Sequence, residues 1–172
     1  MFLNYIKNFL LKKTLKNSLQ NLKNDLSNNV VKTIGLVVDA TRFTETELLI
    51  KELIANGIKP NDITTILYKD TVRKTAENTF PIFNSGHITW NGKFSSTELN
   101  NFVDEKFDLL ISYYDIEIPI LLQITYNSEA EFKVGFSSID KRLNHFMIKT
   151  EVNSYRIFVG ELFKYLKLLK KI

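Results

Sequence analysis

The sequence predicts an α/β fold with three layers, in which a Rossmann-like and mostly parallel sheet of five or six strands lies between helices. Short apolar segments rich in β-branched residues alternate with segments of helical periodicity, and this alternation is typical of βαβ units. Residues 33–39 are apolar on both faces, as buried parallel strands are. The 172 residues, of which 44% are hydrophobic, suffice for one core of ordinary size.

An amphipathic helix is expected ahead of the sheet, over residues 2–27. Leucines recur on one of its faces at a 4-3-4 spacing, and they are Leu15, Leu19, Leu22 and Leu26. We therefore divide the chain into an N-terminal helix, residues 1–28, and a single α/β domain, residues 29–172. The helix either forms an arm that packs on the domain or on a second subunit, or simply covers one face of the sheet.

Six segments have the composition of strands. The first, second and fourth are mainly apolar, and the third, "HITW", ends at the turn dipeptide Asn91-Gly92. The sixth is expected at an edge of the sheet, and the irregular residues 69–86 are interpreted as a loop. The predicted strands are residues 33–39, 62–68, 87–90, 107–113, 131–136 and 145–149.

Four helices are expected between or after these strands. Thr44 and Glu47 have the spacing of a capping box, in which two side chains satisfy the N-terminus of a helix, and Ser95 and Glu98 repeat that spacing. Pro119 suits the first turn of the third helix. The predicted helices are residues 44–57, 95–103, 117–127 and 154–172.

The net charge of +4 is concentrated at the two ends of the chain. Residues 1–28 carry +4 and residues 160–172 carry +3, which leaves −3 for the middle. A mildly acidic body argues against a nucleic-acid surface, which would spread Lys and Arg over the folded face. No secretory signal or membrane span is recognisable, so we expect a cytoplasmic protein.

The sequence offers no recognisable metal site, cofactor motif or catalytic constellation. It has no cysteine, and His87 and His145 are far apart. No glycine-rich phosphate loop follows residues 33–39, and no GxSxG elbow occurs. Asp39 lies in "VVDAT", which looks like a haloacid-dehalogenase phosphatase motif, but Thr41 stands where the second Asp is required. We therefore expect no cofactor, and the sequence argues against an enzyme more than for one.

Two stretches carry a resemblance to a protein family. They are "FDLLISYYDIE" (107–117) and "AEFKVGFSSIDKRLNHFMI" (130–148). Together they resemble a family of uncharacterised small bacterial α/β proteins of about this length, along most of the chain. That family has no assigned activity, so the resemblance implies a fold and no functional residues.

Polar side chains follow several predicted strands and define a candidate ligand site. In an open parallel sheet, ligands bind beyond the carboxyl ends of the strands, where the strand order reverses direction. With the order 3-2-1-4-5, this reversal lies between the first and fourth strands. The loops after the first, fourth and fifth strands would then share one crevice. The candidate ligand-binding residues are Asp39, Thr41, Arg42, Ser112, Tyr113, Tyr114, Asp115, Ser137, Ser138 and Arg142.

These residues allow two interpretations. In the first, Arg42 holds a carboxylate or phosphate and the tyrosines form an amphipathic wall. In the second, which we favour, an Arg42–Asp115 ion pair closes the crevice and both tyrosines pack over it. His145 is expected to be a structural histidine, and Trp90 is expected in the core.

The absence of a catalytic constellation favours a non-enzymatic interaction or regulatory protein. Its basic N-terminal helix would dock on a protein partner, on a second copy of the chain or on an anionic membrane surface. The alternative is a binding protein or enzyme for a small anionic metabolite at the carboxyl edge of the sheet. A nucleic-acid partner is not expected.

Overall fold

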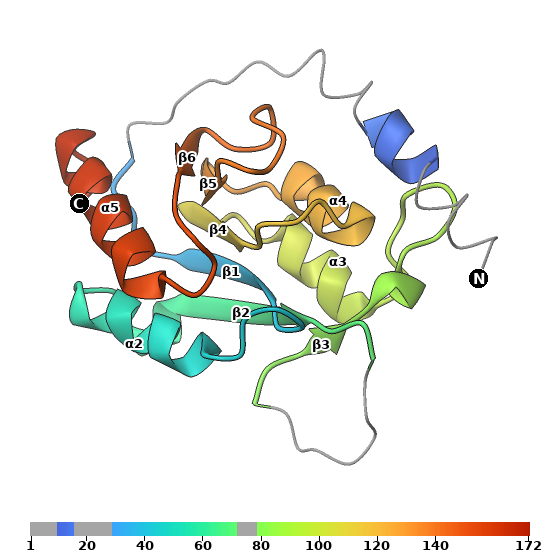
Figure 1. The fold of residues 1–172 in the computed structure, drawn as a ribbon, viewed down its shortest axis with the longest axis horizontal. Coiled ribbons are helices and arrows are strands. Elements are labelled where there is room, and N and C mark those ends of the chain that lie inside the picture. The colour runs from blue at the N-terminus through green and yellow to red at the C-terminus, as the bar shows by residue number, and fades with distance from the viewer. Residues whose placement is uncertain (1–9, 16–28, 72–78) are drawn as a thin grey trace.

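The chain folds into one six-stranded parallel sheet with helices on both faces (Figure 1). The computed structural model describes residues 10–15, 29–71 and 79–172. The strands are β1 (Ile34–Asp39), β2 (Ile63–Tyr68), β3 (Ile82–Phe83), β4 (Leu109–Tyr113), β5 (Phe132–Phe136) and β6 (Phe146–Ile148). The helices are α2 (Thr46–Ala55), α3 (Thr97–Asp104), α4 (Pro119–Asn127) and α5 (Tyr155–Leu168), and the 3-10 turns are η2 (Pro60–Asp62) and η3 (Ser85–His87).

The strand order is β3-β2-β1-β4-β5-β6, and every neighbouring pair is parallel. Helices α2 and α5 pack together on one face of the sheet, and α3 and α4 pack together on the other (Figure 1). The predicted three-layer α/β fold is therefore confirmed, with six strands in the sheet. The order reverses between β1 and β4, as the sequence analysis assumed.

The centre of the sheet is the strand β1, whose six residues are all buried. Such complete burial explains its apolar sequence, because helices cover both faces of a parallel sheet. Gly35 is required by packing: a Cβ atom built there would lie 2.5 Å from the Phe107 ring. The ring of Phe107 therefore occupies the space that any other side chain at position 35 would need.

The third strand was placed wrongly. Residues 82–83 pair with β2, whereas the predicted strand 87–90 contributes an isolated antiparallel bridge between Ile88 and Phe94. That bridge surrounds the predicted Asn91-Gly92 turn, in which Gly92 has φ 77°. A two-residue strand is too short to show the period of two by which strands are recognised.

The helices lie where they were predicted, but neither of the two expected capping boxes forms. Helix α2 begins at Thr46 and has no side-chain cap. Helix α3 is capped by Ser96, one residue later than predicted, whose hydroxyl accepts a hydrogen bond from the Leu99 N–H. Pro119 opens α4, as expected.

Part of the predicted N-terminal helix is described. Residues 10–15 are helical, and both Leu11 and Leu15 are buried in the core. Lys12 forms an ion pair with Glu117, with 2.6 Å between Nζ and Oε2. This turn therefore packs on its own domain, whereas the other leucines of the predicted stripe lie outside the described residues.

Two aromatic predictions had opposite outcomes. His145 is structural: its Nδ1 accepts a hydrogen bond of 2.9 Å from the Lys133 N–H, and its ring stacks on Phe132. Burial lowers the pKa of His145, and the charges of Lys133 and Lys171 lower it further. Trp90 is not in the core, since 58% of its surface is exposed.

Replacing Gly35 tests the packing of β1. Gly35→Ala is expected to lower the free energy of unfolding by about 1–3 kcal/mol, because the new methyl group collides with Phe107 in a filled core. Gly160→Ala in α5 is the matched control, since nothing lies within 4 Å of its added Cβ. That change should stabilise the protein by about 0.5–1 kcal/mol. Urea denaturation measures both, and equal effects would contradict the packing described.

Replacing Leu15 tests the attachment of the N-terminal turn. Leu15→Ala should cost about 2–4 kcal/mol of unfolding free energy, because the side chain is 3% exposed and its removal leaves a cavity. Leu10→Ala is the control on the same turn, because Leu10 is 47% exposed and should change stability by less than about 0.5 kcal/mol. If the two variants unfold at the same urea concentration, the turn does not pack on the domain.

Candidate functional site

The crevice between β1 and β4 is bridged by an ion pair. Arg42 Nε donates to Asp115 Oδ1 at 3.0 Å, and a second guanidinium nitrogen lies 3.4 Å from Oδ2. Asp115 raises the pKa of Arg42, because the carboxylate stabilises the charged guanidinium. Ser138 donates its hydroxyl to the Asp115 carbonyl at 2.9 Å, which ties the loop after β5 to the same point. The structure thus brings these three predicted site residues together.

The two tyrosines do not form an exposed wall, since both are fully buried. The Tyr113 hydroxyl donates to the Val152 carbonyl at 2.6 Å, and the Tyr114 hydroxyl lies 2.7 Å from Thr125 Oγ1. Ser112 is also buried and shares Thr125, at 2.9 Å. Burial raises the pKa of both tyrosines well above the usual range. This arrangement corresponds to the second interpretation of the sequence, in which the crevice is closed.

The far rim of the predicted crevice is only partly assembled. Ser137 and Ser138 are exposed. Arg142 forms a local ion pair with Asp140, in which two guanidinium nitrogens lie 2.9 and 2.6 Å from the carboxylate oxygens. Asp140 raises the pKa of Arg142. The Arg142 fork is therefore engaged within its own loop.

Asp39 and Thr41 join the loop after β1 to the loop after β2. Asp39 is fully buried; its Oδ1 accepts from the Thr41 N–H at 3.0 Å, and its Oδ2 has no hydrogen-bond partner among the described residues. Burial raises the pKa of Asp39, and the nearby Asp70 raises it further. The Thr41 hydroxyl accepts from the Asp70 N–H at 3.1 Å, and the Tyr68 hydroxyl donates to the Asp70 carboxylate.

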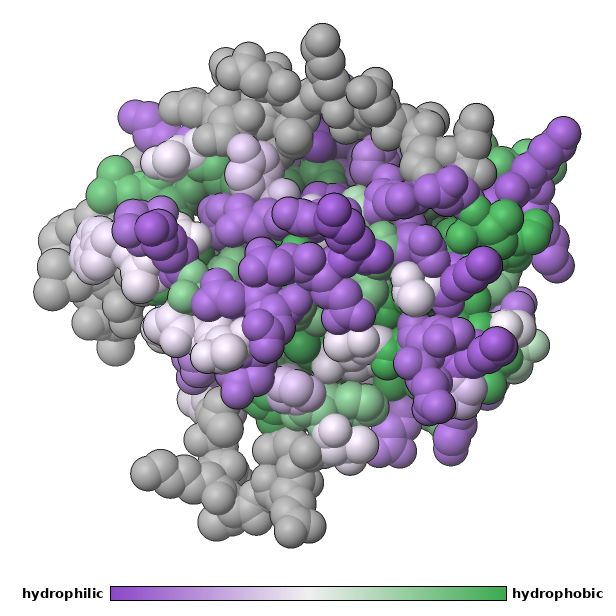
Figure 2. All heavy atoms as spheres, turned by 180° about the vertical axis from the view of Figure 1, so that it is seen from behind, coloured by the Kyte–Doolittle hydropathy of each residue, from purple (hydrophilic) through white to green (hydrophobic). Residues whose placement is uncertain are grey.

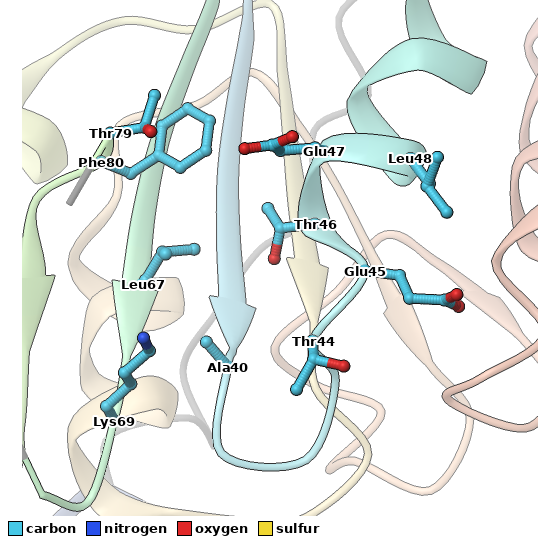
Figure 3. Close-up of a pocket in the computed structure, with 10 residues that line it drawn as sticks. All are labelled: Ala40, Thr44, Glu45, Thr46, Glu47, Leu48, Leu67, Lys69, Thr79 and Phe80. Carbon is cyan, nitrogen blue, oxygen red and sulfur yellow. The ribbon is translucent and has the colours of Figure 1, made fainter. Parts of the chain in front are cut away.

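An open cavity lies on the other side of β1, between the carboxyl ends of β1 and β2 and the start of α2 (Figure 3). Its volume is about 450 Å³, within the range of small-molecule sites in proteins. Most of the described lining residues come from the segment that joins β1 to α2 and from the first turn of α2. The lining residues are Ala40, Thr44, Glu45, Thr46, Glu47, Leu48, Leu67, Lys69, Thr79 and Phe80.

The start of α2 supplies hydrogen-bond donors to this cavity. The Leu48 and Leu49 N–H groups bond to the Glu45 carbonyl, whereas the N–H groups of Thr46 and Glu47 have no acceptor in the part of the chain described. Unpaired N–H groups at a helix start attract negative charge. Thr46 is 6% exposed, and its hydroxyl points toward Ala40 in Figure 3. No acceptor or donor for that hydroxyl is found among the described residues.

Two opposite charges face the cavity. Lys69 rises from the end of β2, and Glu47 extends from α2 toward the wall that contains Phe80 (Figure 3). Neither forms an ion pair or a side-chain hydrogen bond with another described residue. Sequence reasoning missed both as site residues, because Glu47 was assigned to a capping box and Lys69 to an irregular loop. The sequence feature that could have indicated a site here is the transition from strand to helix after β1, because ligands bind beyond the carboxyl ends of parallel strands.

A second cavity, of about 640 Å³, lies at the β3 edge of the sheet beside the start of α3. Several of its polar lining residues are already engaged: Ser96 caps α3 and donates to Glu98, and His87 Nδ1 accepts from the Asn84 N–H. Within residues 10–15, 29–71 and 79–172, no group of three or more His, Cys, Asp or Glu could hold a metal ion. The first cavity is therefore the stronger candidate site.

The surface has one further apolar feature. Figure 2 shows a mainly hydrophilic face with hydrophobic residues toward the edge where α5 ends. The Val31 N–H bonds to the Lys171 carbonyl at 2.7 Å, which holds residues 29–31 beside the C-terminus. Four aliphatic side chains are exposed in these two segments, namely Val30, Leu168, Leu169 and Ile172.

The fold and cavity define a three-layer α/β protein with a metabolite-sized cavity at the carboxyl edge of its sheet. The chain belongs to a family of unknown function (DUF6913), whose profile matches residues 7–169. No curated protein and no solved structure matches it. None of the described helices is long and apolar enough to cross a membrane.

The buried charge of Asp39 predicts a pH-dependent stability. The folded-state pKa is raised, so above the unfolded-state value near 4 the fold must bury a charge that the unfolded chain leaves in water. Asp39→Asn should therefore be more stable than the wild type at pH 7, by about 1–2 kcal/mol. The difference should shrink as the pH falls toward 4 and vanish below it, because the carboxyl then becomes neutral in both states. Urea denaturation at pH 4, 5.5 and 7 measures it, and a constant difference would refute the buried charge.

Proposed function

We propose that this chain is a binding protein for a small anionic metabolite, held in the cavity between α2 and the carboxyl ends of β1 and β2. The observation that carries the proposal is that Lys69 and the uncapped start of α2 line the same cavity. A lysine ammonium and two unpaired helix N–H groups together attract a carboxylate or phosphate group. The position agrees with the general location of ligands in open parallel sheets.

The same observations favour binding over catalysis. Among the described residues that line the cavity, there is no nucleophile with an adjacent base, and the titratable side chains are two glutamates and one lysine. The strand order, which nucleotide-binding doubly wound folds share, supports a Rossmann-like description. The cysteine-free sequence and the family resemblance fit a bacterial cytoplasmic protein.

An interaction protein is the second candidate function. The observation that favours it is the exposure of Val30, Leu168, Leu169 and Ile172 at the end of α5. Exposed lysines flank these side chains, including Lys167 and Lys170, so an acidic protein partner, a second copy of the chain or an anionic membrane surface would fit there. Light scattering and vesicle sedimentation at low and high salt distinguish these partners.

Replacing Lys69 tests the proposed function. Small carboxylates and phosphates that occupy the cavity should raise the melting temperature, with about 2.7 kcal/mol of stabilisation at 100 times the dissociation constant. Lys69→Gln should weaken binding of the best compound about tenfold, because it removes the cation from the site. Lys141→Gln is the control, since Lys141 is exposed and distant in sequence from the cavity lining. Equal weakening in both variants, or none in Lys69→Gln, would defeat the proposal.

A further inference from the structure

The cavity presents both signs of charge, and this limits the kind of ligand that fits it. Lys69 and the start of α2 favour an anionic group, whereas the Glu47 carboxylate repels one. Glu47 and Lys69 do not pair with each other in the described structure. A purely anionic ligand would therefore bring its charge near an unpaired carboxylate, and a purely cationic ligand would meet an unpaired ammonium.

Thr46 gives an independent sign that a ligand belongs in this cavity. The residue is 6% exposed, and its hydroxyl has no partner among the described residues. A hydroxyl in a nearly buried position is normally hydrogen-bonded. Here the hydroxyl lines the open cavity, between α2 and Ala40 (Figure 3), so it is available to hydrogen-bond a molecule bound there.

We infer that the ligand is a zwitterion, a small molecule that carries a primary ammonium as well as a carboxylate or phosphate. This inference rests on the proposed function and specifies the chemical class of its ligand. The anionic group binds Lys69 and the Thr46 and Glu47 N–H groups, and the ammonium binds the Glu47 carboxylate. The Thr46 hydroxyl bonds either group, because a hydroxyl both donates and accepts.

Glu129 provides a control for Glu47 outside the cavity. It is exposed and precedes β5 at the amino edge of the sheet, whereas the cavity lies at the carboxyl edge. In Figure 3 the Glu47 carboxylate extends across the cavity. A loss of affinity in Glu47→Gln that Glu129→Gln does not share is therefore due to the loss of the carboxylate in the cavity and not to the change in net charge.

Two matched sets of probes test the ammonium and distinguish the two anionic groups. The carboxylate set is 4-aminobutyrate, butyrate and butylamine, and the phosphate set is phosphoethanolamine, ethyl phosphate and ethylamine. Isothermal titration calorimetry measures each affinity for the wild type, Glu47→Gln, Glu129→Gln and Lys69→Gln, after thermal unfolding confirms that each variant folds. The set that binds more tightly identifies the anionic group.

In the wild type, the zwitterion of the preferred set should bind at least tenfold more tightly than either of its single-charge analogues. Glu47→Gln should weaken the zwitterion about tenfold and leave or improve the affinity of the anion, because it removes a repulsive charge. Glu129→Gln should change neither by more than about twofold.

Two results overturn different parts of the account. If the zwitterion and the anion bind alike, and Glu47→Gln affects both equally, the ligand is a simple anion and the proposed function stands without the inference. If no probe of either set binds the wild type, or if Lys69→Gln leaves every affinity unchanged, the proposed function fails and the inference fails with it.

Discussion

The complete burial of β1 is the constraint on which the rest of the structure depends. Its six residues have neighbours on both sides, β2 and β4, and helices on both faces. The chain must therefore leave the core abruptly after Asp39. It does so by a tight turn in which the Arg42 and Phe43 N–H groups bond to the Asp39 carbonyl, at 3.2 and 3.0 Å. This turn fixes the start of α2 and the direction of Arg42.

The turn also decides which side of β1 is open. Phe43 is buried against Tyr113, with 4.7 Å between the ring centroids, so the aromatic core reaches up to the end of β4. Arg42 then spans the remaining gap to Asp115. On the β2 side, the described residues show no such aromatic contact between the end of β1 and a neighbouring strand, and the chain runs past Ala40 to the uncapped start of α2. The cavity is the space left between that start and Lys69.

The sequence predicted the fold because the alternation of strands and helices is a local property that each segment carries by itself. It also identified the edge of the sheet where polar residues gather, since polar side chains follow a strand where it leaves the core. Which of those residues remain accessible depends on contacts between distant segments. Tyr113 bonds to Val152, 39 residues away in the chain, and no local pattern indicates such a contact.

The same reason explains why the cavity residues were missed. Glu47 has the spacing of a capping box, so the sequence assigned it to one. In the structure the residue at the N-cap position is Glu45, whose side chain makes no capping hydrogen bond, and the N–H groups at the start of α2 are therefore left uncapped. Lys69 follows β2 in a segment without periodicity, so no pattern placed it opposite α2. The described part of the N-terminal helix was easier to anticipate, because the burial of Leu15 follows from the leucine spacing.

The central claim is that ligands enter on the β2 side of β1 while the β4 side is closed. Amide chemical shifts measured by NMR during a titration with the tightest-binding small molecule test it most directly. The account predicts that the amides of Thr46, Glu47 and Lys69 shift in proportion to occupancy, because they border the cavity. Shifts confined to the amides of Arg42, Asp115 and Ser138 would contradict it, because they would show that the ligand opens the crevice between β1 and β4.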